Sequence, residues 1–283
     1  MLTLQGRCSY WRRNLLVLVT THSRSNALTQ RQGINAAFVK RCADLGAKVI
    51  NADLTTTPDA QKLFQGLDDK IVFQKTDVTK WDQLRQVIDV AKEKFGKTPD
   101  VYVAGAGVFE PKWSNFWHDP EDESYAQVQI LLSHPIKFAR MAMTQLVSED
   151  RKGVILPFAS LGGLAGSYNC PIYIACKHGV VGFVKSMKPL EKYEGIKMVT
   201  ICPGAVNSPF WTTEKRERTG FDKAESLQPD DVAKAMIDLV QEGKYGGGTL
   251  LEIMPNNGPK TRVVPEWNID VSVFPQRKGG SCL

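Results

Sequence analysis

The stretch that decides the fold is residues 154–177, which read VILPFASLGGLAGSYNCPIYIACK. Its first five residues form an apolar run typical of a buried strand, and Ser160 closes that run. Glycines then predict a loop, and Tyr173 and Lys177 follow at a spacing of about one helical turn. We therefore expect a strand, a loop and a helix that presents both side chains on one face.

These side chains suit proton transfer. An ammonium beside a phenol favours the phenolate, so we expect Lys177 to lower the pKa of Tyr173. A tyrosine tuned in this way exchanges a proton with a substrate hydroxyl, and the Ser160 hydroxyl can hold the same oxygen. Alone, such a pair is more often an exposed amphipathic face. The order of strand, serine, loop, helix, strand and Pro203-Gly204 favours oxidation of an alcohol or reduction of a carbonyl.

Apolar and amphipathic segments alternate along the chain. Strands are expected at 15–20, 48–53, 71–74, 101–104, 154–158, 197–202 and 249–253, and helices at 33–45, 58–67, 80–95, 123–147, around 173–177 and at 229–240. This alternation predicts an α/β fold with a doubly wound parallel sheet, Rossmann-like and in a single domain. Residues 1–32 are an atypical segment with the first strand, 33–258 the Rossmann-like domain and 259–283 a surface tail.

Composition excludes several classes of protein. The chain has 283 residues, 42% of them hydrophobic, which suits one sizeable core. A net charge of +6 from scattered basic residues argues against a nucleic-acid partner. The six cysteines and four histidines show no metal spacing, so we expect free thiols and no metal. The apolar run after Arg13 is too short for a signal sequence or a membrane span, so we expect a cytosolic protein without membrane contact.

Candidate cofactor residues gather where parallel strands end, which is where open sheets bind ligands. Asp53 ends the second strand, where its carboxylate can bind the adenosine ribose and repel a 2′-phosphate, favouring NAD over NADP. Asp77 follows the third strand, near the expected adenine, and Gly105 and Gly107 follow the fourth and allow close backbone approach. Each residue alone is typical of a turn. Together they predict a dinucleotide site.

From about residue 33 to residue 267 the chain resembles the short-chain dehydrogenase/reductase family. The resemblance rests on Ser160, Tyr173 and Lys177, and on 77–78 (DV), 104–107 (AGAG), 179–183 (GVVGF) and 203–209 (PGAVNSP). Residues 107–110 (GVFE) and 263–267 (VVPEW) are similar to members related to hydroxyprostaglandin dehydrogenases. The resemblance implies a homodimer or homotetramer and a small-molecule alcohol or ketone substrate.

The resemblance also assigns roles to residues. It makes Tyr173 the general acid/base, Lys177 the residue that tunes it and binds the nicotinamide ribose, and Ser160 the residue that orients the substrate oxygen. The cofactor contacts that it implies are Gly33, Ile34, Gly105, Val206 and Ser208. It further places Arg140 on a helix that often carries a basic cofactor contact, and an exposed helix charge is the equal alternative.

The phosphate loop departs from the family pattern Thr-Gly-x-x-x-Gly-Ile-Gly. Gly33-Ile34 remain, but Thr29 stands at the first glycine and Asn35 at the last. Side chains there crowd the pyrophosphate, so we expect weakened NAD binding. Because the mismatch covers residues 1–32, we hypothesise a misplaced exon boundary or a retained intron. Arg31, near this loop, keeps NADP open as an alternative.

A second departure is Leu131, which occupies the position of the family's catalytic asparagine. That asparagine supports a relay water through a distortion of its helix, and leucine cannot hydrogen-bond. We therefore expect impaired proton exchange with solvent. A catalytically impaired relative that senses nucleotide or binds a partner is the alternative function.

Aromatic side chains crowd two segments beside the expected site. Four follow the fourth strand and two follow Pro209: Phe109, Trp113, Phe116, Trp117, Phe210 and Trp211. They suit an apolar pocket for an apolar alcohol or ketone. Packing under a long loop is the equal alternative.

Overall fold

A computed structural model describes residues 15–21, 33–119, 121, 124–208, 210–211, 215–216, 221 and 225–266. Thr29, Arg31 and most of the atypical segment 1–32 lie outside these ranges, as do Pro209 and the tail from residue 267. The exon hypothesis and the NADP alternative concern residues outside the described part of the chain.

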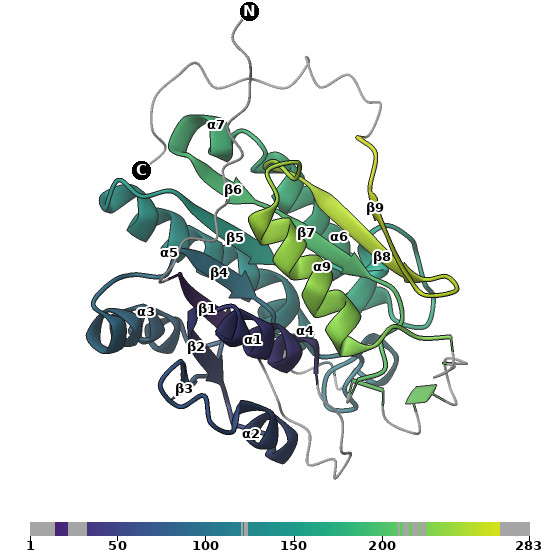
Figure 1. The fold of residues 1–283 in the computed structure, drawn as a ribbon. Helices are drawn as coiled ribbons and strands as arrows, with labels where there is room; N and C mark the ends of the chain where they lie inside the picture. Colours follow the sequence, from purple (N-terminus) through teal and green to yellow (C-terminus); the bar gives the residue numbers. More distant parts are fainter. Residues whose placement is uncertain are drawn as a thin grey trace, which may run out of the picture.

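The central sheet is parallel and has six strands in the order β3-β2-β1-β4-β5-β6 (Figure 1). The strands are β1 (Leu16–Thr20), β2 (Lys48–Asp53), β3 (Ile71–Lys75), β4 (Val101–Ala104), β5 (Gly153–Pro157) and β6 (Ile196–Met198). The order reverses between β1 and β4, and this reversal creates a crevice at the carboxyl ends of the strands. The doubly wound fold expected from the sequence is confirmed.

Helices cover both faces of this sheet. They are α1 (Ile34–Asp44), α2 (Pro58–Phe64), α3 (Trp81–Phe95), α4 (Ala126–Val128), α5 (His134–Ser148), α6 (Pro171–Ser186), α7 (Leu190–Glu194) and α9 (Pro229–Gln241), with short 3-10 turns η1 (Phe116–His118) and η3 (Leu161–Gly163). Successive residues of β1 point to opposite faces. Leu16 and Leu18 pack in the core with α3, α5 and α6, whereas Val17 and Val19 pack with α1 and α9, which lie side by side in Figure 1.

The single strand expected at 197–202 is divided at Val199. β6 continues the central sheet beside β5, and β7 (Thr200–Pro203) pairs with β8 (Leu250–Pro255) in a second sheet. Antiparallel to β8 lies β9 (Pro259–Val263), reached through the left-handed residues Asn257 and Gly258. Residues 259–263, expected at the start of a surface tail, are exposed but form a strand of this second sheet.

The long helix expected at 123–147 contains a distortion. Residues Gln129–Ser133 form a π-helix, η2, between α4 and α5. Glu123 lies outside the described residues. Among the described helices none is both long and apolar enough to cross a membrane.

Candidate active site

Ser160, Tyr173 and Lys177 meet at the carboxyl end of β5. Ser160 is the N-cap of η3, and its hydroxyl accepts a hydrogen bond from the amide of Gly162 at 3.1 Å. Tyr173 and Lys177 lie one turn apart on α6, and the Ser160 hydroxyl hydrogen-bonds the phenol of Tyr173. Gly163 lets η3 touch α6, because a Cβ there would lie 2.7 Å from the carbonyl oxygen of Lys177.

Lys177 is almost fully buried, with 4% of its surface exposed. Its Nζ donates to the carbonyl oxygen of Phe158 at 2.7 Å and lies 5.6 Å from the centre of the Tyr173 ring. Burial disfavours the charged ammonium and lowers the pKa of Lys177 to about 8.

Burial also governs the phenol, and it raises the pKa of Tyr173 to about 12. The hydrogen bond from Ser160 lowers this pKa but does not offset the burial. The pKa of Tyr173 is thus raised in this state, where the sequence led us to expect it lowered, and the expected effect of Lys177 on it stays a prediction. The ammonium is directed to the Phe158 carbonyl and approaches the ring face.

Asp53 and Asp77 stand at neighbouring strand ends, as expected, and both are engaged locally. Asp53 is 5% exposed, and its carboxylate accepts hydrogen bonds from the amide of Leu54 at 2.7 Å and from the hydroxyl of Thr21. The carboxylate of Asp77 accepts from the amide and hydroxyl of Thr79, at 3.0 and 2.7 Å. An ionised carboxylate offers about four lone-pair sites, so one carboxylate can accept hydrogen bonds from several donors.

The N-terminus of α1 suits an anion. Gly33 is its extended N-cap and, as a glycine, offers no side chain to cap the helix. The first amide groups of a helix lack intrahelical acceptors and, with the helix dipole, favour a phosphate. A Cβ on Gly33 would meet nothing within 4 Å, so no atom of the described residues fills the space beside this end of the helix. The N-terminus of α1 and the Asp53 carboxylate fit a dinucleotide.

Asn35, which stands at the last glycine of the family's phosphate loop, contacts the sheet directly from α1. Its side-chain amide donates to the carbonyl oxygen of Gly105 at 2.8 Å, which ties α1 to the residue after β4. Sequence reasoning missed this bridge, because a side-chain bond to a distant backbone carbonyl leaves no local pattern.

The remaining expected cofactor residues divide into two groups. Ile34 begins α1, and Val206 and Ser208 are buried in the loop after β7. Arg140 is instead exposed on α5, where its guanidinium donates to Thr144 one turn later. That arrangement matches the alternative interpretation of Arg140 as an exposed helix charge.

Some of the expected aromatic side chains surround Tyr173. The centre of the Phe109 ring lies 5.0 Å from that of Tyr173, and Phe210 lies 6.1 Å from it. Trp211 packs on Phe109 at 5.3 Å. In contrast, Trp113, Phe116 and Trp117 are 41–49% exposed, and the Trp117 ring packs on that of Tyr168, with centres 4.6 Å apart.

Comparison with known proteins identifies the family to which the chain belongs. The model of a family described as short chain dehydrogenase matches residues 28–219. The chain belongs to the short-chain dehydrogenase family. The family resemblance and the oxidoreductase class expected from the sequence are confirmed.

Curated relatives of this short-chain dehydrogenase are distant in sequence. A putative short-chain type dehydrogenase/reductase from Mycolicibacterium smegmatis is 27% identical over 71% of this chain and 77% of its own. The NAD(+)-dependent 15-hydroxyprostaglandin dehydrogenase of Mus musculus is 28% identical over 80% of this chain and 88% of its own. The fold is shared with carveol dehydrogenase from Mycobacterium avium in complex with NAD, at a TM-score of 0.70 and 20% identity over 88% of this chain and 97% of that one.

Leu131 departs from the family in side chain but not in backbone. It lies within the π-helix, is 1% exposed and packs with Ile172 and Cys176. The helix distortion therefore exists in this short-chain dehydrogenase without an asparagine, and the side chain at its centre is apolar.

The described cysteines form no disulfide with one another. Cys42, Cys170, Cys176 and Cys202 are buried thiols, and Cys8 and Cys282 lie outside the described ranges. Within the described residues no group of His, Cys, Asp and Glu could hold a metal ion.

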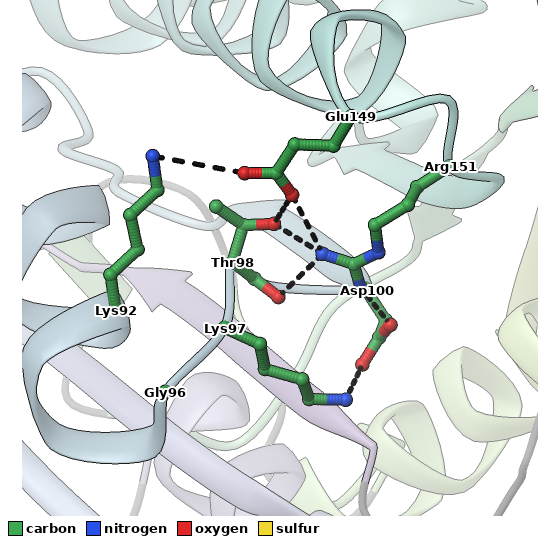
Figure 2. A pocket seen from close by; sticks show the side chains of 7 residues that line it. All are labelled: Lys92, Gly96, Lys97, Thr98, Asp100, Glu149 and Arg151. Atoms are coloured by element: carbon green, nitrogen blue, oxygen red, sulfur yellow. Dashed lines mark hydrogen bonds and ion pairs between the residues drawn. The ribbon is translucent and has the colours of Figure 1, made fainter.

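A charged pocket lies at the other edge of the sheet, near the amino ends of β4 and β5. It is lined by Lys92, Gly96, Lys97, Thr98, Asp100, Glu149 and Arg151 (Figure 2). Arg151 lies at its centre and contacts Asp100, Glu149 and the Thr98 carbonyl. These groups satisfy one another, and the opposite edge of the sheet carries Tyr173.

Proposed function

We propose that this short-chain dehydrogenase interconverts a secondary alcohol and its ketone with NAD(H), using Ser160, Tyr173 and Lys177. The observation that carries the proposal is the meeting of these side chains on η3 and α6, at the carboxyl edge of the sheet. The bound cofactor would accept the hydride as NAD when the alcohol is oxidised and donate it as NADH when the ketone is reduced.

Residues at successive strand ends would each bind a different part of the dinucleotide. Asp53 would accept hydrogen bonds from the adenosine ribose, with Asp77 near the adenine. The amide groups at Gly33 and Ile34 would face the pyrophosphate, and Gly105, Val206 and Ser208 would adjoin the nicotinamide half. Support for NAD over NADP comes from Asp53, whose carboxylate would repel a 2′-phosphate, and from the relatives named for NAD.

Proton transfer would occur at the Tyr173 hydroxyl. With a pKa near 12 the phenol is protonated at neutral pH, so this state is set to give a proton to a ketone oxygen. Ser160 would hold that oxygen by a second hydrogen bond. Alcohol oxidation requires the phenolate, and Lys177 would favour it once its ammonium turns from the Phe158 carbonyl toward the phenol.

The substrate would be apolar around its reacting carbon. Phe109 and Phe210 place aromatic rings beside the phenol of Tyr173, and Trp211 packs on Phe109. Rings in this position favour an apolar alcohol or ketone by burying its surface. A cytosolic location and a homodimer or homotetramer stay predictions from the sequence.

The test is titration calorimetry with NADH and NADPH, followed by assay of apolar secondary alcohols and ketones. We expect NADH to bind more tightly than NADPH, and Asp53→Ala to narrow that difference. Tyr173→Phe should bind NADH as the wild type does and lose at least about a thousandfold in turnover, since it lacks the transferable proton.

The second candidate is a nucleotide-binding relative with little catalysis, and the buried apolar Leu131 favours it. It would be supported by tight NADH binding with no turnover on any alcohol or ketone in the wild type. A folded wild type that binds neither NADH nor NADPH would contradict both candidates.

A further inference from the structure

Asn35 and Gly105 form a bridge across the switch point of the sheet. Asn35 is the second residue of α1, the helix after β1, and Gly105 follows β4. Asn35 Nδ2 donates to the Gly105 carbonyl oxygen at 2.8 Å, and the Gly105 amide donates to the Thr20 carbonyl oxygen at 3.0 Å. The exit of β4 is thus tied both to β1 and to the helix that follows β1.

The Asn35 side chain also crowds position 105. A Cβ on Gly105 would lie 2.3 Å from Asn35 Oδ1 and 2.8 Å from Asn35 Nδ2. The backbone of Gly105 is outside the left-handed region, so a side chain at this position would not strain the backbone but would have to displace the Asn35 amide from its place in the bridge. Asn35 Oδ1 is buried and accepts no hydrogen bond from the described residues, so the amide is held by the Nδ2 bond and by packing.

We propose that Asn35 is a positioning residue for the cofactor, which rests on the function proposed above. The N-terminus of α1 and the exit of β4 are two walls of the crevice that opens where the strand order reverses. The Asn35 amide fixes the separation of these walls through a side-chain bond, where the family pattern brings helix and strand together with a glycine. The crevice between α1 and β4 thereby stays defined although Asn35 stands where the family pattern has a glycine.

The test is a cycle of variants: Asn35→Ala, Asn35→Gly, Gly105→Ala and Asn35→Gly/Gly105→Ala. NADH dissociation constants are measured by calorimetry, and melting temperatures without cofactor. Loss of one neutral hydrogen bond should weaken NADH binding of Asn35→Ala roughly threefold to tenfold. Gly105→Ala should weaken it by more than about tenfold. The double variant should bind as Asn35→Gly does, roughly threefold to tenfold more weakly than the wild type, because the clash is removed but the hydrogen bond is still missing.

The control is Gly243→Ala, beyond α9, where an added Cβ meets nothing within 4 Å. It should leave both measurements unchanged. Should Asn35→Ala lower the melting temperature yet bind NADH as the wild type does, the bridge is only a structural staple and the proposal fails. The proposal also fails if the double variant binds no better than Gly105→Ala. Absence of NADH binding in the folded wild type would instead overturn the proposed function, and the cofactor role of Asn35 with it, while the melting temperatures would still report whether the bridge exists.

Discussion

Burial moves the pKa values of Tyr173 and Lys177 in opposite directions, and both shifts favour neutral side chains. Desolvation penalises a phenolate and an ammonium alike, and here it exceeds the effect of their neighbours. The described state is therefore a buried phenol beside a lysine poised to lose its proton near pH 8. A charge brought into this site, on cofactor or substrate, would act on both groups at once.

The lysine shift predicts a pH dependence of stability. Because its pKa is about 8 in the fold and 10.5 ordinarily, the unfolded chain binds more protons between these values, so stability rises as pH increases through that window. The pKa of Tyr173 is raised from 10 to about 12, so above pH 10 its titration lowers the stability as pH increases. Lys177→Met should remove a rise of roughly 1–3 kcal/mol in the free energy of unfolding. Urea titrations from pH 7.5 to 10 measure it.

The control for that measurement is Lys192→Met at an exposed position on α7. Its pH profile should follow the wild type. A Lys177→Met profile parallel to the wild type would show that Lys177 has an ordinary pKa in the fold.

At the scale of elements, the site depends on how closely η3 approaches α6. Gly162 and Gly163 lie against Tyr173 and Lys177, so the loop after β5 and the helix that carries both residues are in direct contact. The contact at Gly163 is with the helix backbone, which cannot rotate away as a side chain can. Local backbone packing therefore positions both candidate catalytic side chains.

Two glycines of this loop allow a matched comparison. A Cβ on Gly163 would lie 2.7 Å from the Lys177 carbonyl oxygen, whereas one on Gly166 would meet nothing within 4 Å. Gly163→Ala should lower the free energy of unfolding by about 1–3 kcal/mol, as overpacking does, and should lower turnover because α6 shifts. Gly166→Ala should change neither. Equal denaturation midpoints and equal turnover for the two variants would show that the loop yields without moving α6.

At the scale of the whole molecule, much of the fold followed from the alternation of apolar strands and amphipathic helices, because burial on a parallel sheet imposes that pattern. β9 did not follow, since its exposed residues gain order by pairing with β8 rather than from their own pattern. The spacing of Tyr173 and Lys177 predicted their shared face. It did not predict the pKa direction of Tyr173, because desolvation depends on packing from distant segments such as Phe109.

The candidate site and a cluster of ion pairs lie at opposite ends of the strands of the central sheet. The candidate site lies at the carboxyl ends, and the charged pocket of Figure 2 lies at the amino ends of β4 and β5. There Arg151 joins the residues before β4 to the end of α5, and Asp100 also accepts the amide of Leu16 at 2.8 Å. One partly buried side chain thus connects the starts of β1, β4 and β5.

This arrangement predicts that Arg151→Ala destabilises the fold without affecting cofactor binding. The variant leaves Asp100 and Glu149 without their shared cation, and at 25% side-chain exposure of Arg151 the cost should be about 1–3 kcal/mol. For a domain of this size that lowers the melting temperature by roughly 2–10 °C. Lys94→Ala, which removes an exposed ion pair with the adjacent Glu93, should lower it by less than about 1 °C.

Both variants should bind NADH as the wild type does when calorimetry is run well below the melting temperature. Weaker NADH binding by Arg151→Ala alone would show that strain at the amino edge reaches the crevice through β1 and β4, and the two edges would then have to be treated as one unit.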